Sequence, residues 1–169
     1  ENNAIVELPF DAIEVANFLI NEKYECNIPF VGGKTKCRKY EIEESIKIAQ
    51  DNRPVYHFSN PVGWMNDPNG FSDYKGEHHL FFQYYPYATH WDSMHWGHAK
   101  STDFIKWEYL PVALAPDQDY DKLGVFSGSA IEDGDKQILI YTGVEEKVVE
   151  NGEKCICQNQ CIAIGNGVD

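Results

Sequence analysis

The chain has 169 residues, 43% hydrophobic and 24% charged, a composition that indicates a globular fold and excludes an intrinsically disordered chain. Its net charge of -13 argues against a nucleic-acid-binding protein, because the densest basic run is the loose one from Lys34 to Lys39. No stretch approaches the roughly 20 apolar residues of a membrane-spanning helix, so no membrane association is expected.

The first fifty residues predict a short α-helical segment. Apolar residues recur at helical spacing between Pro9 and Ile20, and a second helix is expected from Tyr40 to Gln50. Residues 25–40 contain a proline and adjacent glycines, which favour a connecting loop. Pro54 ends the helical pattern, so residues 1–52 are expected to form a helical lead-in and residues 53–169 a second unit.

After Pro54 the sequence changes to short strand-like runs separated by turn residues. The segment Asp133-Gly134-Asp135 predicts a β-hairpin. The predicted strands cover residues 70–72, 79–85, 94–100, 106–110, 126–132, 137–142 and 155–164. Short strands at regular spacing indicate an all-β architecture, and this pattern alone leaves a sandwich, a barrel and a propeller open.

The densest group of candidate functional residues runs from Gly63 to Gly70 and reads Gly-Trp-Met-Asn-Asp-Pro-Asn-Gly. Its many turn formers favour an ordinary surface turn. However, an aromatic and an apolar residue precede Asp67, and Pro68 restricts the backbone of that aspartate to an extended conformation. A rigid carboxylate beside an aromatic side chain is a group that can be aimed at a substrate.

Three further motifs follow in order: Leu80-Phe-Phe-Gln-Tyr-Tyr-Pro86, Trp96-Gly-His-Ala-Lys-Ser-Thr-Asp103 and Phe126-Ser-Gly-Ser-Ala130. Each is weak alone, but their order is specific. From about Arg53 to its end, the sequence resembles glycoside hydrolase family 32, which contains invertases, inulinases, levanases and sucrose-6-phosphate hydrolases.

The resemblance implies a five-bladed β-propeller, of which this chain would supply the first two to three blades. It implies hydrolysis of β-fructofuranosidic bonds, in sucrose or a related fructoside, by a retaining double displacement with Asp67 as the nucleophile. It implies no cofactor and no metal. The residues expected to contact the sugar are Asn66, Gln83, Trp91, Phe126 and Ser127, with Trp64 as a wall residue.

Two motifs of the family are missing from the chain. One is Arg-Asp-Pro, and the other is a Glu-Cys pair that supplies the acid catalyst. The arginines are Arg38 and Arg53, and the pair Glu25-Cys26 precedes the nucleophile motif. We therefore expect the chain alone to be inactive and the activity to belong to a longer parent. Unpaired strand edges are adhesive, so self-association or pairing with the remainder of the propeller is expected.

Two other kinds of site compete with this interpretation. Trp64, Trp91 and Trp96 could form the sugar platform of a non-catalytic carbohydrate-binding module. A metal site at His90, His95 and His98 is a weaker alternative.

The five cysteines cannot all pair within the chain, which favours reduced thiols and a cytoplasmic location, with secretion as the alternative. Alternating cysteines such as Cys155, Cys157 and Cys161 favour strand packing over metal binding.

Overall fold

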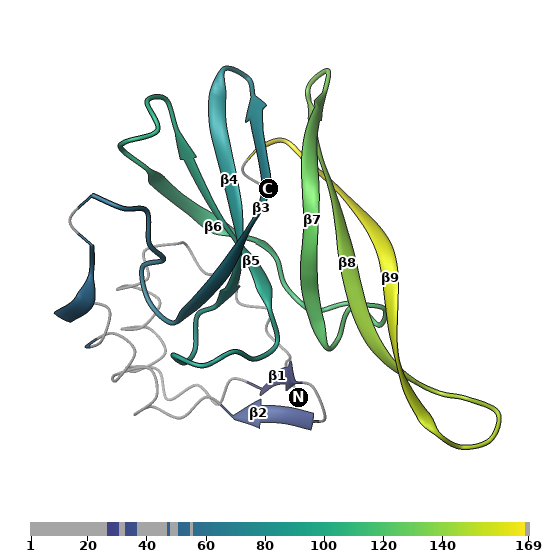
Figure 1. The fold of residues 1–169 in the computed structure, drawn as a ribbon. Helices are drawn as coiled ribbons and strands as arrows, with labels where there is room; N and C mark the ends of the chain where they lie inside the picture. Colours follow the sequence, from purple (N-terminus) through teal and green to yellow (C-terminus); the bar gives the residue numbers. More distant parts are fainter. Residues whose placement is uncertain (1–26, 31–32, 37–46, 48–50, 55, 168–169) are drawn as a thin grey trace.

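The computed structural model describes residues 27–30, 33–36, 47, 51–54 and 56–167. Two antiparallel sheets account for most of this part of the chain and lie beside each other (Figure 1). A small hairpin of β1 (Asn27–Phe30) and β2 (Gly33–Lys36) forms a third, two-stranded sheet. No helix in the described ranges has the length and apolar character needed to cross a membrane.

The first large sheet is a four-stranded meander. Its strands are β3 (Trp64–Tyr74), β4 (Glu77–Tyr85), β5 (His95–Ser101) and β6 (Glu108–Leu114), each paired with the next. Lys75 and Gly76 connect β3 to β4 with φ angles of 49° and 80°. Positive φ at both central residues matches the right-handed twist of the strands, so this two-residue turn closes a tight hairpin.

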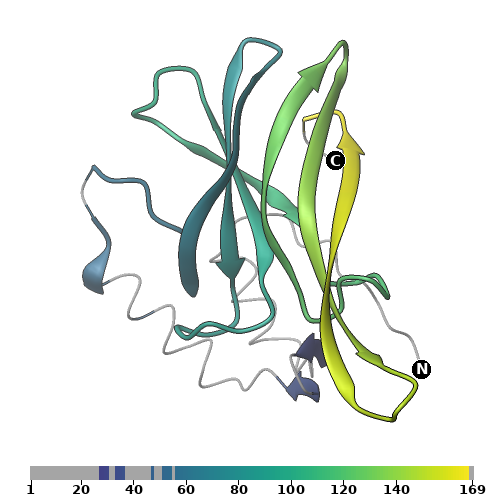
Figure 2. The ribbon, with the colours of Figure 1, turned by 45° about the vertical axis from the view of Figure 1, so that its right-hand side comes forward.

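The second large sheet has three strands, β7 (Gly124–Asp133), β8 (Lys136–Val148) and β9 (Lys154–Gly165), in that order. The hairpin predicted at Asp133-Gly134-Asp135 is confirmed, because Asp133 pairs with Lys136 across the turn. Strands β8 and β9 pair without interruption along their whole length. Their far end projects past the first sheet, as the turned view in Figure 2 shows.

The main core lies between the two sheets. Successive residues of a strand point to opposite faces of its sheet, so Phe81 faces the second sheet and Phe82 faces away from it. The buried members of the core between the sheets are Phe81, Trp96, Val125, Leu139, Tyr141 and Cys161. The cluster on the other face of the first sheet contains Phe82, Tyr84 and Ala99, with Phe58, Trp107 and Tyr109 packed against them. Removing each large side chain from water contributes roughly 1.5–3 kcal/mol.

The all-β prediction is confirmed. Strands β3 and β7, the first of their sheets, pack against each other and run in the same direction (Figure 1). This arrangement of first strands fits two successive propeller blades, one of four strands and one of three in the described ranges. The predicted helices at 9–20 and 40–50 lie outside the described residues apart from Lys47. The loop predicted at 25–40 was wrong in part, because β1 and β2 pair within it.

Candidate active site

The segment around Asp67 is a bulged strand. Met65 pairs with Tyr84 and Pro68 pairs with Phe82, so Asn66 and Asp67 together oppose the single residue Gln83. The ordinary reading of this segment as a surface turn was therefore wrong, because its turn-forming residues serve the bulge. The extra residue of a bulge re-aims side chains, and both Asn66 and Asp67 are exposed. The half-buried Trp64 donates from Nε1 to Oδ1 of Asn66 over 2.9 Å.

Strand β7 carries a second bulge. Phe126 pairs with Thr142 and Ser129 pairs with Ile140, so Ser127 and Gly128 oppose one residue of β8. Ser127 is exposed. A Cβ atom on Gly128 would lie 2.0 Å from the carbonyl oxygen of Ile140, so this close approach of backbones requires glycine.

The two bulges lie at the same level of neighbouring strands. A Cβ atom on Gly70 would lie 3.1 Å from the Cβ atom of Ala130. Gly70 of β3 therefore lies directly beside Ala130 of β7. Asp67 precedes Gly70 by three residues, and Ser127 precedes Ala130 by three. Because the strands run in the same direction, the bulge with Asp67 and the bulge with Ser127 lie on the same side of these contacts (Figure 1).

Buried amide and indole groups hold β7 against the first sheet. Gln83 is 3% exposed and donates from Nε2 to the carbonyl oxygen of Val125 over 2.9 Å. Trp96 is fully buried and donates from Nε1 to the carbonyl oxygen of Phe126 over 3.1 Å. With its amide turned to suit its neighbours, Asn69 also accepts from Gln83 over 3.0 Å and from Trp96 over 3.2 Å. These bonds fix the backbone that leads into the second bulge.

An aromatic wall stands beside the second bulge. Trp91 is 44% exposed and meets the half-buried ring of Phe126 edge to face, with 6.0 Å between ring centroids. The loop that carries Trp91 is fixed by the buried carboxylate of Asp92, which accepts from the backbone N–H of Ser93 over 2.5 Å. His90 lies 3.7 Å from the other carboxylate oxygen. Burial raises the pKa of Asp92 above its ordinary value.

Sequence reasoning missed Asp92 and Asn69, which hold the predicted site residues in place. Asp92 follows Trp91 directly, and its only signal in the sequence was this adjacency. Asn69 lies inside the motif from Gly63 to Gly70, but its partners come from β4 and β5. The predicted residues lie on three elements and the loop before β5: Trp64, Asn66 and Asp67 on β3, Gln83 on β4, Trp91 in the loop, and Phe126 and Ser127 on β7.

The histidines proposed as a metal site do not assemble one. His98 is buried and its Nε2 lies 2.8 Å from Nδ1 of His79. The Nδ1 atom of the buried His95 lies 2.9 Å from the carbonyl oxygen of Ser93. Within the ranges that the structure describes, no group of three or more His, Cys, Asp or Glu side chains is arranged to hold a metal ion.

The sequence model of the glycosyl hydrolases family 32 N-terminal domain matches residues 57–168. The chain belongs to glycosyl hydrolase family 32. A sucrose-6-phosphate hydrolase of Zymomonas mobilis is 57% identical over 96 residues, which are 57% of this chain and 19% of the relative. A levanase of Bacillus subtilis is 52% identical over 109 residues, which are 64% of this chain and 16% of the relative.

Solved structures of the family share this fold. A family 32 β-fructofuranosidase of Bombyx mori is 45% identical with a TM-score of 0.65, over 77% of this chain and 27% of that enzyme. A mutant of that enzyme in complex with sucrose is 46% identical with a TM-score of 0.61, over 77% of this chain and 28% of that enzyme. The partial-propeller prediction is thereby confirmed, and this family 32 chain spans less than a third of these relatives.

Proposed function

We propose that this family 32 chain is part of an enzyme that hydrolyses β-fructofuranosidic bonds through a covalent intermediate, with Asp67 as the nucleophile. The main support for this proposal is the exposed carboxylate of Asp67, which lies on the bulge of β3. This bulge lies beside the bulge of the neighbouring strand β7, which contains Ser127. The names of the relatives, sucrose-6-phosphate hydrolase, levanase and β-fructofuranosidase, support fructosides as the substrate class.

The proposed reaction needs two carboxyl groups. The carboxylate of Asp67 attacks the anomeric carbon of the fructosyl unit, while a protonated carboxyl gives its proton to the leaving oxygen. In retaining enzymes the two groups lie about 5–5.5 Å apart. Because Trp64 already donates to the amide oxygen of Asn66, we assign the amide nitrogen of Asn66 to a sugar hydroxyl. Trp91 and Phe126 offer apolar ring surface to the sugar.

We propose that the acid catalyst comes from another part of the parent, so that this chain alone is inactive. An acid catalyst is a carboxyl group with a raised pKa that reaches the substrate. Burial raises the pKa of Asp92 and of Asp121, but these residues are 2% and 1% exposed. Asp121 accepts from Tyr141 and from the N–H of Gln118, and Asp92 accepts from its own loop. Neither carboxyl group is open to a sugar.

Sucrose hydrolysis by the isolated chain and by the parent enzyme tests both parts of this proposal. We expect no turnover by the isolated chain. In the parent, Asp67→Asn should lower kcat on the order of 10,000-fold or more, because no covalent intermediate can form. Asp133→Asn is the matched control, since Asp133 is an exposed carboxylate at the β7–β8 hairpin and should leave kcat unchanged. Full activity of the Asp67→Asn enzyme would refute the nucleophile assignment.

A second candidate function, sugar binding without hydrolysis, is favoured by the exposed ring of Trp91 beside Phe126. The three-tryptophan platform expected for such a module was wrong, because Trp96 is fully buried between the sheets. Calorimetry of the isolated chain with fructose, sucrose and inulin separates the two functions. Saturable binding that Trp91→Ala abolishes would favour the binding module, whereas absent binding fits a site that needs the rest of the enzyme.

We also propose that another sheet of the parent covers the outer face of the second sheet. Ile131, Ile138 and Ile164 lie side by side across its three strands, and Ile140 pairs with Ile162. Ile131, Ile162 and Ile164 are each at least 58% exposed in this chain, which makes a ladder of apolar side chains open to water. A sheet packed against this ladder would bury it, as in stacked propeller blades.

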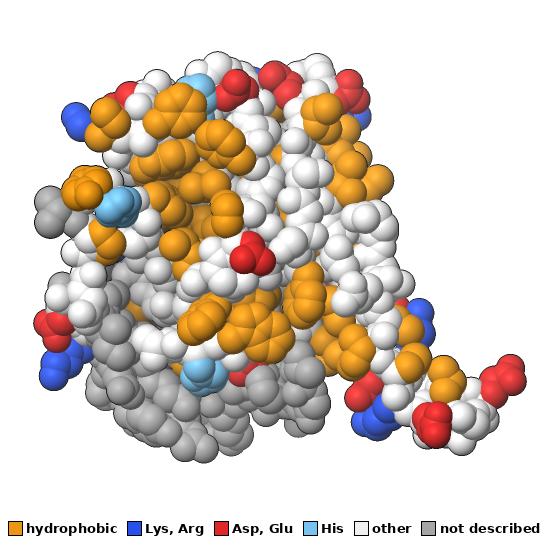
Figure 3. All heavy atoms as spheres, viewed as in Figure 1, with side chains coloured by type: hydrophobic (Ala, Val, Ile, Leu, Met, Phe, Trp, Pro, Cys, Tyr) orange, Lys and Arg blue, Asp and Glu red, His pale blue; other side chains and the backbone are white. Residues whose placement is uncertain are grey.

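Lysines in this ladder test the proposed packing. Replacing Ile162 and Ile164 by lysine should lower the Tm of the parent, because the proposed packing would bury both side chains there. The Tm of the isolated chain should change little, because both side chains are exposed in it. An equal loss in both proteins would contradict the proposal. Figure 3 shows that apolar side chains also gather over the sheet β3–β6. In the isolated chain we expect such faces to promote self-association, which sedimentation velocity would detect.

A further inference from the structure

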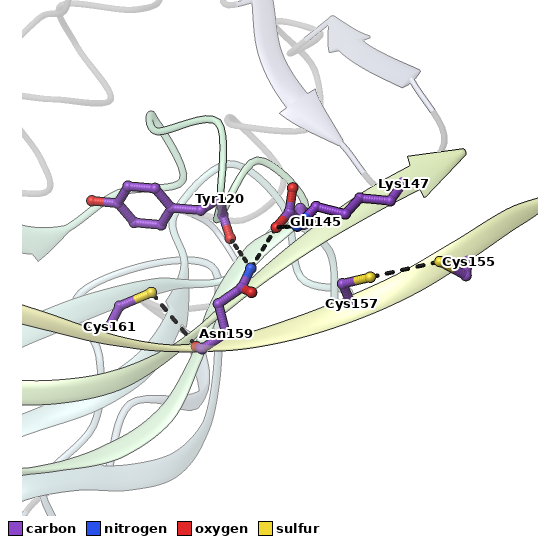
Figure 4. A network of polar contacts seen from close by, with 7 residues as sticks. All are labelled: Tyr120, Glu145, Lys147, Cys155, Cys157, Asn159 and Cys161. Carbon is purple, nitrogen blue, oxygen red and sulfur yellow. Dashed lines mark hydrogen bonds and ion pairs between the residues drawn. The ribbon is translucent and has the colours of Figure 1, made fainter. Parts of the chain in front are cut away.

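The projecting end of the β8–β9 hairpin carries a pair of thiols that the fructoside site does not use. Cys155 and Cys157 lie two residues apart on β9, so their side chains share one face of the strand. Their Sγ atoms are 3.6 Å apart (Figure 4). Both cysteines are free and half-buried, so reagents from solution reach them.

Charged and polar side chains of β8 and β9 lie beside this pair. Cys157 lies opposite Glu145 on β8, and Cys155 lies opposite Lys147. Lys147 and Glu145 form an ion pair of 2.7 Å, and Asn159 donates from Nδ2 to Glu145 over 2.6 Å (Figure 4). The ladder continues on both sides of the cysteines, so the backbone beneath the two sulfur atoms is regular.

A regular strand is a poor frame for a disulfide between these residues. Two residues of an extended strand span about 6.6–6.8 Å, at the upper end of the Cα–Cα range of about 4.4–6.8 Å in disulfides. The sulfur atoms would have to approach from 3.6 Å to about 2.05 Å, although the two Cα–Cβ bonds leave the strand in parallel. The ladder at Lys147 and Glu145 would have to break to allow this.

The same distance suits two thiolates that share one metal ion. A tetrahedral ion with bonds of about 2.3 Å to sulfur places two sulfur ligands about 3.8 Å apart. We propose that Cys155 and Cys157 form a bidentate thiolate site for a soft, thiophilic metal ion of the Zn²⁺ and Cd²⁺ class. The two thiols give up two protons to solvent as two metal–sulfur bonds form. No third His, Cys, Asp or Glu completes a site among the described residues, so water or an external ligand fills the other positions.

A cadmium titration of the reduced full-length chain tests this site. The chain would carry Cys26→Ser and Cys37→Ser, so that Cys155, Cys157 and Cys161 are its remaining thiols. We expect one Cd²⁺ per chain, an ultraviolet thiolate-to-cadmium charge-transfer band, and release of two protons. Cys155→Ser or Cys157→Ser should weaken binding on the order of 100-fold, because the second thiolate binds as part of a chelate.

Cys161→Ser is the matched control. Cys161 is buried farther along β9, and its thiol faces the carbonyl oxygen of Asn159. The Cys161→Ser chain should therefore bind Cd²⁺ as tightly as the chain that keeps Cys161. Undiminished binding by Cys157→Ser, loss of binding by Cys161→Ser, or no binding at all would each overturn the proposal. So would ready formation of a Cys155–Cys157 disulfide in the folded chain exposed to oxidised glutathione, detected as the loss of two hydrogens.

Discussion

Lowering the pH from 7 to 5 should destabilise the fold through two buried histidines of β5. Burial lowers the pKa of His95 from 6.5 to about 4. Burial, followed by the charges of His79 and Lys100, lowers the pKa of His98 from 6.5 to about 3. His98 also lies against the ring of Phe81, with 4.2 Å between ring centroids. Both imidazoles are therefore neutral in the folded chain across this pH range.

The sign and size of the effect follow from where the protons bind. Below pH 6.5 the unfolded chain protonates both imidazoles, whereas the folded chain protonates them only near pH 4 and pH 3. Stability is therefore complete above pH 6.5 and falls as the pH drops. Between pH 7 and pH 5 each histidine lowers the free energy of unfolding by about 2 kcal/mol, and both together by about 4 kcal/mol. This is a large part of the roughly 5–15 kcal/mol that stabilises a typical domain.

Urea unfolding followed by tryptophan fluorescence at pH 7 and pH 5 measures this difference. His95→Gln and His98→Gln should each reduce the difference by about 2 kcal/mol, because glutamine does not titrate. Each variant must be compared with the unmodified chain, because burial also raises the pKa of Asp92 and Asp121. These carboxyl groups bind protons more readily in the folded chain, so they stabilise the fold as the pH falls and offset part of the histidine effect. An unchanged pH difference in the His98→Gln chain would refute the reasoning. His79, whose pKa burial also lowers, should follow the same trend.

Two further substitutions test the second bulge and the core behind it. Gly128→Ala should lower the free energy of unfolding by about 3 kcal/mol, because the Cβ atom of the alanine would overlap the backbone at Ile140. Ser129 is an exposed neighbour, so Ser129→Ala should leave the free energy of unfolding nearly unchanged in the same urea titration. Tyr141→Phe removes a 3.0 Å bond to the buried carboxyl of Asp121 and should cost about 1–3 kcal/mol at pH 7. That loss should shrink in acid as the carboxyl is protonated, and a loss independent of pH would contradict this account.

Local chemistry predicted most of the second unit of the fold. The aromatic-rich run from His79 to Tyr85 predicted β4, and the turn residues around Gly134 predicted the β7–β8 hairpin. The β1–β2 hairpin was missed because Pro29 and the glycines after it favour a loop over a strand. The pairing of β1 with β2, which the local pattern does not contain, makes that segment a hairpin.

The candidate site was harder to predict in detail because its geometry depends on pairing across strands. The sequence identified Asp67 and Asn66 through a motif, but their bulge exists only relative to Gln83 on another strand. The alternative of a carbohydrate-binding module placed Trp96 among exposed rings, yet the packing of the two sheets buries it completely. Hydrophobic pattern alone does not separate a buried aromatic from an exposed one, because both suit a strand.

The bulge at Asn66 and Asp67 adds the proposed nucleophile to β3 as part of one residue beyond one-to-one pairing with β4. Deleting one of these two residues would restore one-to-one pairing between Met65 and Pro68 on one strand and their partners on β4, without shifting any downstream pair. We therefore expect the fold to tolerate the loss of the bulge that presents this carboxylate. We expect a descendant of this sequence that loses one codon here to keep its fold and its family resemblance while losing the proposed activity.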